Sequence, residues 1–411
     1  MYRFLWLLLF MIGSSLSKGY SQQENDWLLS MLREKASPQL KEILSKPDEY
    51  RVQVVYTQID RDKRNKPHFT SYKLTPVDHY FYPASTVKLP TALLALEKLH
   101  QLNVKGLNMY SSMLTDSGFS RQLKISQDLS SDSKKPSVAH YLKKIFIVSD
   151  NDAYNRLYEF NGQQFLNERL WALGFKNTRI THRFQYPLTE EENRHTNPIR
   201  FYNADQLVYE QKGEYSNVKF NYPNSILVGE KHMDNDDKLW DGPMDFSRKN
   251  NFPLTEQQDM LRRVLFPESV PRHKRFKLKE EDYALLYKYM SMHPAESDYP
   301  KYDPKEFFES YAKFFFYRAG KQKKPDYIKI FNKAGWSHGF LTDNAYIIDL
   351  KNNVEFLVSA TIYVNSDGVI NDNKYEYEEK GYPFFKEVGE ILYHHELARK
   401  RYHDPDLKRF E

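Results

Sequence analysis

A serine and a lysine stand three residues apart within residues 80–90, where an aromatic, strand-like run gives way to a helical pattern of leucines. If a helix begins near Ala84, this spacing places Ser85 and Lys88 on one face, about one turn apart. A partly desolvated lysine loses its proton more easily than in water and can serve as base to a serine nucleophile. A helix N-terminus also favours developing negative charge. The alternative is a helix cap beside a solvated lysine.

Two further polar clusters could complete such a site. The triplet Ser149-Asp150-Asn151 lies on a short break between two helical patterns, and taken alone it reads as an ordinary helix cap. The run Lys333-Ala334-Gly335-Trp336-Ser337-His338-Gly339 falls between two expected strands near the C-terminus. Each cluster is a weak signal, because the serine-lysine spacing also occurs in Ser15-Leu16-Ser17-Lys18. The three clusters in this order are a much stronger signal.

The ordered set resembles the S-x-x-K, S-D-N and K-T-G motifs of the penicillin-recognising serine hydrolases, most closely the class A β-lactamases. The resemblance covers nearly the whole chain after a leader. It implies the α/β (α+β) class and a β-lactamase/transpeptidase-like fold, with an antiparallel sheet from both chain ends and a mostly helical part as the other wall of a cleft. It further implies that a β-lactam or a related amide is hydrolysed through an acyl-serine, with no metal or other cofactor.

The resemblance also implies a role for each residue. Ser85 would be the nucleophile, Lys88 would take its proton, and Ser149 would relay a proton to the departing nitrogen. The backbone N–H groups of Ser85 and Trp336 would form the oxyanion hole. Substrate binding would fall to Asn151 at the side-chain amide, Lys333 at a carboxylate, Gly335 and Ser337.

Two positions depart from the class A pattern. In that class a glutamate in an R-x-E-x-x-L-N pattern activates the water that clears the acyl-enzyme. The matching run here is Arg183-Phe184-Gln185-Tyr186-Pro187-Leu188-Thr189, which places Gln185 at the glutamate position. An amide cannot act as a general base, and losing that base costs about 10²–10⁴ in rate. We therefore expect slow deacylation unless a glutamate of residues 190–192 substitutes. The second departure is Ala334, which removes a hydroxyl from the carboxylate site.

Other functions stay open on these observations. A D,D-peptidase or penicillin-binding relative acting on peptidoglycan peptides normally lacks the class A glutamate. A non-catalytic protein could instead bind a cell-wall fragment in the cleft, although binding alone requires neither a nucleophile nor two proton carriers. His338 reads as a polar turn residue, although an unperturbed histidine can transfer protons near neutrality. His395-Glu396 lacks the second histidine of H-E-x-x-H, so we expect no metal site there.

The first 21 residues have the pattern of a secretory signal peptide. Arg3 precedes an apolar run over residues 5–12, and small residues follow. The run is too short to span a bilayer comfortably, so we expect cleavage between Ser17 and Gln22 and no stable membrane anchor afterwards. The product would be an exported protein, periplasmic or extracellular, and we expect a monomer. It would have no disulfides, because the chain has no cysteine.

The charge balance does not point to nucleic acid as a partner. The chain has 60 lysines and arginines against 55 acidic residues, a formal net charge of +5 that is spread along its length. This weak excess gives no reason to expect nucleic acid binding. A small molecule remains the expected partner.

We expect residues 22–411 to form one serine hydrolase domain. Its expected parts are a mostly helical region over about 89–200, an inserted segment over about 199–325, and C-terminal strands with a helix over 326–402. Apolar alternation predicts a hairpin over 51–59 and 69–74. Helical spacing predicts helices over most of 100–145 and over these ranges: 26–44 with a break near Pro38, 254–266, 279–292, 304–317 and 383–402. Strands are predicted over 327–331, 344–349 and 354–364.

Overall fold

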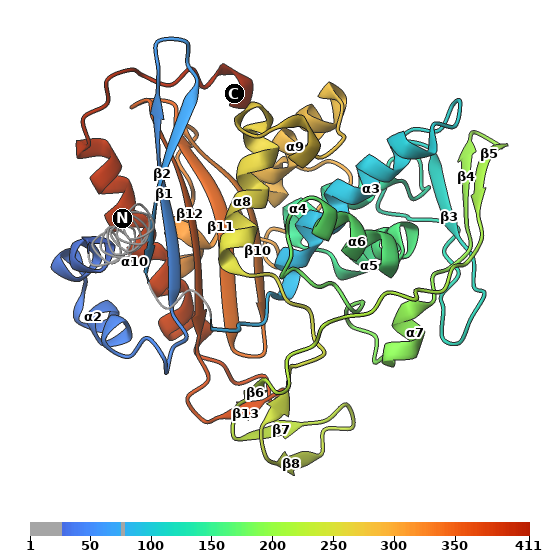
Figure 1. Cartoon of the computed structure of the whole chain (residues 1–411), viewed down its shortest axis with the longest axis horizontal. Coiled ribbons are helices and arrows are strands. Elements are labelled where there is room, and N and C mark those ends of the chain that lie inside the picture. The colour runs from blue at the N-terminus through green and yellow to red at the C-terminus, as the bar shows by residue number, and fades with distance from the viewer. Residues whose placement is uncertain (1–26, 75–78) are drawn as a thin grey trace, which may run out of the picture.

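The computed structural model describes residues 27–74 and 79–411 of the chain (Figure 1). The predicted signal peptide, residues 1–21, lies outside the described residues. Within the described ranges, every helix is too short or too polar to cross a membrane.

A five-stranded antiparallel sheet with strands from both chain ends lies at the centre, in the order β10-β11-β12-β1-β2. Its strands are β1 (Gln53–Arg61), β2 (Pro67–Leu74), β10 (Ile328–Ser337), β11 (Phe340–Asp349) and β12 (Val354–Tyr363). β1 pairs with β2 on one side and with β12 on the other, with Val55 opposite Ser359. The predicted α+β class and two-ended sheet are therefore confirmed. β10 is an edge strand, which leaves one side of its backbone free to face the helical part.

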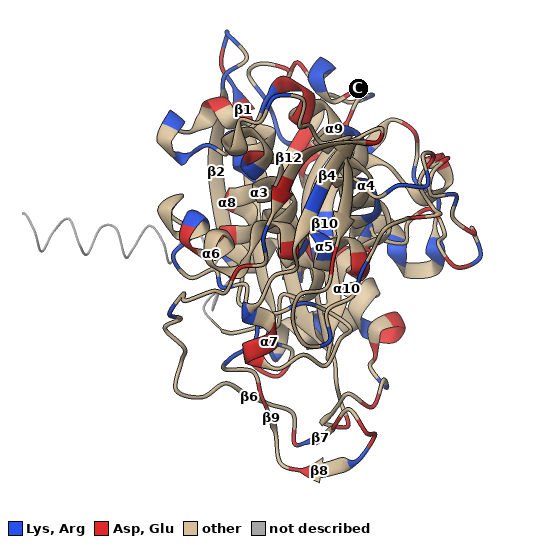
Figure 2. Ribbon diagram, turned by 90° about the vertical axis from the view of Figure 1, so that its right-hand side faces the viewer, with Lys and Arg blue, Asp and Glu red and all other residues tan. Residues whose placement is uncertain are grey.

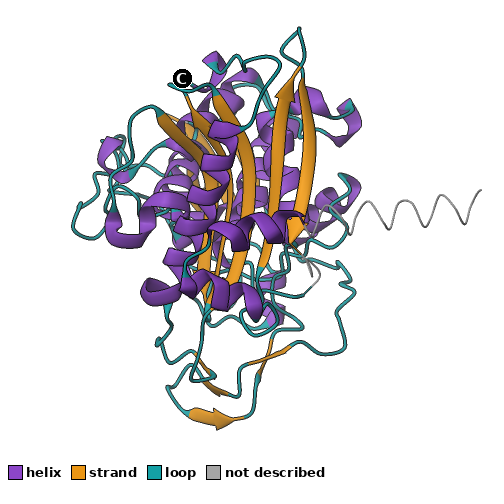
Figure 3. Cartoon of the chain, turned by 90° about the vertical axis from the view of Figure 1, so that its left-hand side faces the viewer, coloured by secondary structure: helices purple, strands orange, loops and turns teal. Residues whose placement is uncertain are grey.

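Helices cover both faces of this sheet (Figures 1 and 3). A helix over residues 27–35, α2 (Pro38–Ser45) and α10 (Tyr382–Ala398) pack on one face through a shared apolar cluster. The other face is covered by α8 (Leu254–Leu265), and α9 (Glu280–Ser291) packs against β10. Because β1, β10, β11 and β12 are covered on both sides, they are almost entirely buried, whereas half of the residues of the edge strand β2 are exposed. The predicted break near Pro38 is confirmed, since Pro38 opens α2 and Ser37 Oγ caps it by accepting from the Leu40 N–H at 3.2 Å.

The second part of the molecule is mostly helical. It contains α3 (Lys88–Leu102), α4 (Val138–Val148), α5 (Asn151–Asn161), α6 (Gln163–Ala172) and the short α7 (Glu190–Arg194). The prediction of helix over most of 100–145 is wrong between α3 and α4. Asn103 ends α3 with a φ of 50°, and the chain then runs through turns and β3 (Ser112–Thr115). β3 is fixed by pairing with β4 (Ile199–Asn203), a partner remote in sequence that no local pattern reveals.

The helix predicted over 304–317 is also wrong. This stretch is a series of turns that ends in an irregular coil at Phe314–Arg318, where Phe316 has a φ of 67°. Phe314, Phe315 and Phe316 are all buried, and the first two contact Phe385 of α10. Three consecutive side chains cannot share one face of a helix, so an irregular backbone buries them better.

The elements of the predicted inserted segment, 199–325, lie in several different parts of the fold. β4 and β5 (Gln206–Gln211) complete a small sheet with β3, while α8 and α9 belong to the cover of the main sheet. Between them lie β6 (Leu227–Val228), β7 (Lys231–Met233), β8 (Leu239–Asp241) and β9 (Met244–Asp245). β7 pairs with β13 (Val369–Ile370). We call residues 227–249 the arm, which protrudes at the lower end of the molecule (Figures 1 and 2).

Candidate active site

Ser85 lies in a tight 3-10 turn, Ala84–Val87, that leads directly into α3. Ala84 has a φ of 44°, a conformation that L-residues rarely adopt and that is found preferentially at functional sites. The Ser85 side chain is half-buried and lines the cleft. In the described part of the chain no group accepts from its backbone N–H. This N–H is therefore available to an incoming oxygen.

Lys88, at the start of α3, is completely buried. Its Nζ donates to the carbonyl oxygen of Ser149 and, at 2.6 Å, to Oδ1 of Asn151, and it lies 3.3 Å from Ser149 Oγ. Burial lowers the pKa of Lys88 well below its usual value, and the nearby charge of Lys333 lowers it further. A neutral lysine amine has two hydrogens, which Lys88 can donate to these two nearest acceptors, and a lone pair that can accept a proton. The environment thus favours the form that a base requires.

The triplet 149–151 joins α4 to α5, as the sequence predicted. Ser149 ends α4 with a φ of 61°, and Asp150 caps α5 by accepting from the Ala153 N–H at 2.7 Å. Asp150 therefore acts as an ordinary helix cap. The flanking Ser149 and Asn151 have a different use, since their side chains point to Lys88.

Lys333 reaches the same hydroxyl from β10. It is buried, and its Nζ donates to Ser149 Oγ at 2.9 Å and to the Ala334 carbonyl oxygen at 2.6 Å. Burial lowers the pKa of Lys333 to about 7, a shift that the carboxylate of Asp343 opposes. Ser149 Oγ is therefore in contact with two lysines from distant parts of the chain.

Gly335 allows β10 to approach the Ser85 turn. A Cβ at this position would lie 2.7 Å from the Ser85 backbone nitrogen and 2.9 Å from both the Pro83 oxygen and the Thr86 nitrogen. These neighbours are backbone atoms, which cannot move aside cheaply. The close approach is thus possible only because residue 335 lacks a side chain.

These elements enclose a cleft of about 1110 Å³. Six of the residues to which the resemblance assigns a position in the site line this cleft: Ser85, Ser149, Asn151, Gln185, Trp336 and Ser337. Lys88 and Lys333 lie buried behind this lining. Within residues 27–74 and 79–411, no group of His, Asp and Glu side chains is arranged to hold a metal ion.

The structure also adds residues that the sequence reasoning missed. The Phe184 ring lies 5.4 Å from Lys88 Nζ, and Phe307 and Tyr311 line the cleft beside Trp336. Phe307 and Tyr311 were hidden by the wrong helix prediction over 304–317. The available signal in the sequence was the presence of several aromatic residues close together in an otherwise polar stretch.

Gln185 lies on an exposed loop of the cleft with a φ of 65°. The glutamates that follow it are engaged elsewhere. Glu190 contacts Arg248 at 3.0 Å, and Glu191 lies 3.4 Å from His195. Glu192 accepts from Arg121 Nε at 2.7 Å and forms a capping box with Thr189 at the start of α7. None of the three contacts Ser85 or Lys88.

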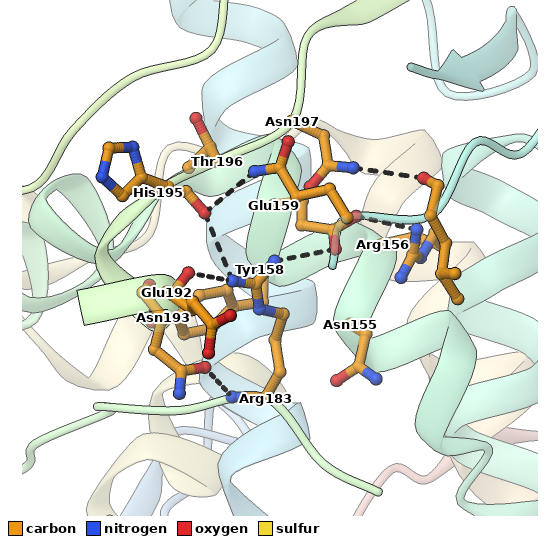
Figure 4. Close-up of polar contacts among 12 residues, drawn as sticks. Asn155, Arg156, Tyr158, Glu159, Arg183, Glu192, Asn193, His195, Thr196 and Asn197 are labelled. Atoms are coloured by element: carbon orange, nitrogen blue, oxygen red, sulfur yellow. Dashed lines mark hydrogen bonds and ion pairs between the residues drawn. The ribbon is translucent and has the colours of Figure 1, made fainter. Parts of the chain in front are cut away.

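A buried network holds this loop in place (Figure 4). Arg183 forms a 3.0 Å ion pair with Glu159 of α5, and it also donates to the backbone oxygens of Glu192 and His195. Arg156 adds a second 3.0 Å ion pair to Glu159. Because Arg183 begins the run that contains Gln185, this network fixes the start of the loop against α5.

Residues 21–214 match the sequence model of the Beta-lactamase enzyme family. This segment is a β-lactamase-family domain. It carries Ser85, Lys88 and the Ser149 triplet, and it makes the protein a serine hydrolase of the β-lactamase type. A comparison with curated protein sequences finds no match.

Solved β-lactamase structures are similar to most of the chain at low identity. A β-lactamase from Xanthomonas campestris pv. campestris has 14% identity and a TM-score of 0.49, covering 89% of this chain and 98% of that one. One from Sphaerobacter thermophilus has 10% identity and a TM-score of 0.47, covering 87% and 96%. An ancestral class A β-lactamase has 14% identity and a TM-score of 0.46, covering 87% and 100%.

Proposed function

We propose that this protein is an exported, class A β-lactamase-like serine hydrolase that opens β-lactams or related amides through an acyl-Ser85 intermediate. One observation carries the proposal. The hydroxyl of Ser149 accepts from Lys333 at 2.9 Å and lies 3.3 Å from Lys88, beside a turn that presents Ser85 to the cleft. Two lysines buried around one hydroxyl have no purpose in a helix cap, whereas they can carry protons for acyl transfer.

Acylation follows from this arrangement. Ser85 Oγ attacks the carbonyl carbon while Lys88 takes its proton, so that a C–O bond forms and the oxyanion rests on the N–H groups of Ser85 and Trp336. The C–N bond then breaks, and the proton passes from Lys88 through Ser149 Oγ to the departing nitrogen. Lys333, in its charged form, attracts the substrate carboxylate.

Deacylation requires an activated water that breaks the ester and returns a proton to Ser85. Gln185 cannot activate that water, and the glutamates over 190–192 are paired elsewhere. We therefore propose a long-lived acyl-enzyme. The same observation favours a second candidate, a D,D-peptidase or penicillin-binding relative acting on peptidoglycan peptides, because such enzymes do without the class A glutamate.

Intact-mass spectrometry of the protein with a penicillin separates the candidates. A transient adduct with turnover indicates a β-lactamase, and a long-lived adduct indicates a penicillin-binding relative or a slow hydrolase. No adduct indicates a protein that only binds. A Ser85→Ala variant must lose any adduct, and if it keeps one, another residue is the nucleophile.

Export is a separate part of the proposal. It depends on the leader pattern over residues 1–21. Expression of the full chain in a Gram-negative host, followed by fractionation and N-terminal sequencing, should find a periplasmic product that begins between residues 18 and 22. A cytoplasmic product that retains Arg3 would contradict it.

A further inference from the structure

One basic side chain in the cleft has no role in the acyl transfer. Lys249, at the end of the arm, lines the cleft beside Tyr82, His182 and His338. The Tyr82 ring stacks on His182 at a centroid distance of 6.3 Å, and His338 meets the edge of Tyr82 at 5.1 Å. A packed aromatic wall thus lies beside the ammonium group at this end of the cleft.

The charge of Lys249 is uncompensated. Among the described residues, no carboxylate lies within ion-pair distance of its Nζ, and no group accepts a hydrogen bond from it. The acidic side chains nearby already have partners, since Asp245 accepts from the Ser247 N–H at 2.8 Å and Glu190 pairs with Arg248 at 3.0 Å. A partly desolvated ammonium without a partner gains strongly from an anionic ligand.

The neighbouring histidines do not add positive charge. Burial lowers the pKa of His182 to about 3 and that of His338 to about 4, and the charge of Lys249 contributes in both cases. His182 Nδ1 lies 2.8 Å from the carbonyl oxygen of Arg183, so this nitrogen carries the proton. Its Nε2 is a buried acceptor without a partner. The site therefore offers a ligand one positive charge, on Lys249, and one hydrogen-bond acceptor without a partner, His182 Nε2.

The position of Lys249 along the cleft indicates which part of a substrate it meets. From Lys333 to its last residue, Ser337, β10 rises by roughly 13 Å at about 3.3 Å per residue, and His338 follows in the turn. In the proposed reaction the substrate carboxylate lies at Lys333, and its reacting carbonyl lies between Ser85 and Trp336. The acyl side chain must then run onward toward His338, where Lys249 lies.

We propose that Lys249 binds an anionic group on the acyl side chain of the substrate, so that the protein prefers β-lactams or related amides with a carboxylate there. This inference rests on the proposed acyl transfer at Ser85. It assigns the arm a part in substrate choice, because the arm carries Lys249 to the end of β10.

Two penicillins that differ by one carboxylate test the inference. Benzylpenicillin has a neutral acyl side chain, and carbenicillin has the same side chain with an added α-carboxylate. The measured quantity is the second-order acylation rate constant of each, by stopped flow or quenched intact mass. Lys249→Met should lower the carbenicillin-to-benzylpenicillin ratio by about tenfold or more, as expected when one charge-assisted contact is lost. Lys249→Arg should keep most of the ratio.

Lys63→Met is the matched control, because it removes a lysine from the exposed turn between β1 and β2. Its ratio should equal that of the unmodified protein. A ratio that is the same in Lys249→Met as in the unmodified protein overturns the inference and leaves the acyl transfer intact.

A binding measurement separates the two proposals. Ser85→Ala, with and without Lys249→Met, is titrated with both penicillins by calorimetry. If neither compound acylates the unmodified protein but the carbenicillin preference in binding depends on Lys249, the acyl transfer fails and the anion site stands. If neither compound binds Ser85→Ala and neither acylates the unmodified protein, both proposals fail.

Discussion

Lys88 and Lys333 both contact Ser149 Oγ, yet the proposed reaction needs them in opposite protonation states. Lys88 must be neutral to take the proton of Ser85, whereas Lys333 must be charged to attract a carboxylate. Burial lowers the pKa of both, and for Lys333 the value is about 7. Asp343 stabilises the charged form of Lys333. The two lysines therefore define a pH window in which the site can work.

This window predicts a bell-shaped dependence of the acylation rate constant on pH. As pH falls, Lys88 becomes protonated and the rate declines because the base is lost. As pH rises through about 7, Lys333 loses its charge and the rate declines because the carboxylate is held less well. Measuring the second-order acylation rate constant with benzylpenicillin from pH 5 to 10 checks both limbs. In Lys333→Arg the alkaline limb should disappear, since arginine stays charged. An alkaline limb that survives this change would assign it to another group.

Deacylation gives a second prediction at the scale of one residue. Gln185→Glu should shorten the lifetime of the acyl-enzyme by about 10²-fold or more, because it restores a general base at the cleft. The lifetime is measured by intact mass after excess penicillin is removed. Gln206→Glu on the exposed β5 adds the same charge outside the cleft and should change nothing. Equal lifetimes in both variants would place the missing base elsewhere.

Residue types and their order were enough to select Ser85, Lys88, Ser149 and Lys333 from the sequence. The contacts that their side chains make could not be predicted from residue types and their order. The 2.9 Å contact between Lys333 and Ser149 joins a strand to a helix terminus across a long sequence separation, and it depends on how two parts of the molecule pack. Lys249 escaped notice for a similar reason, because a lone lysine in a polar stretch carries no local signal.

At the scale of elements, the contact between β10 and the Ser85 turn is the critical one. Gly335→Ala would place a methyl group 2.7 Å from the Ser85 nitrogen, so β10 must withdraw from the turn. A shift of about 1 Å in such a site costs about 10²-fold in rate. We expect at least that loss in the acylation rate constant, with the far-UV circular dichroism spectrum unchanged.

Gly174→Ala provides the control for this effect. A Cβ there meets only Arg263 Nη2 at 4.0 Å, but Gly174 has a φ of 101°, so the substitution strains the backbone locally. It should lower the melting temperature without lowering the acylation rate constant. Equal acylation by the two variants would show that the close approach of β10 is unimportant.

Elements with a regular apolar period were predictable, and those fixed by remote partners were not. The hairpin of β1 and β2, the break at Pro38 and helices α8 and α9 follow from spacing and turn residues. β3 depends on pairing with β4, and the coil at Phe314–Arg318 depends on the aromatic surface of α10. In these two stretches tertiary contacts override the local helical preference.

At the scale of the molecule, the sheet takes strands from both chain ends and the cleft lies where its edge strand meets the helical part. A buried ion pair between Arg61 of β1 and Glu355 of β12 joins the two ends at 2.5 Å. Glu396 of α10 adds a 2.9 Å ion pair to Arg399, which also pairs with Asp60 of β1. The site on β10 therefore depends on a sheet that is complete only when both ends of the chain are folded.

The residues after α10 belong to this core, although the last element predicted from the sequence was a helix ending near residue 402. Phe410 is 2% exposed, and its ring lies 5.1 Å from Tyr346 of β11, 5.3 Å from Phe331 of β10 and 5.2 Å from Tyr287 of α9. Phe410→Ala should lower the free energy of unfolding by about 3–5 kcal/mol, because it opens a cavity where the sheet meets the helices. Urea unfolding followed by tryptophan fluorescence measures this loss. Leu397→Ala, on an exposed face of α10, should stay within about 0.5 kcal/mol. A loss at Phe410 no larger than at Leu397 would show that the last residues contribute nothing to the core.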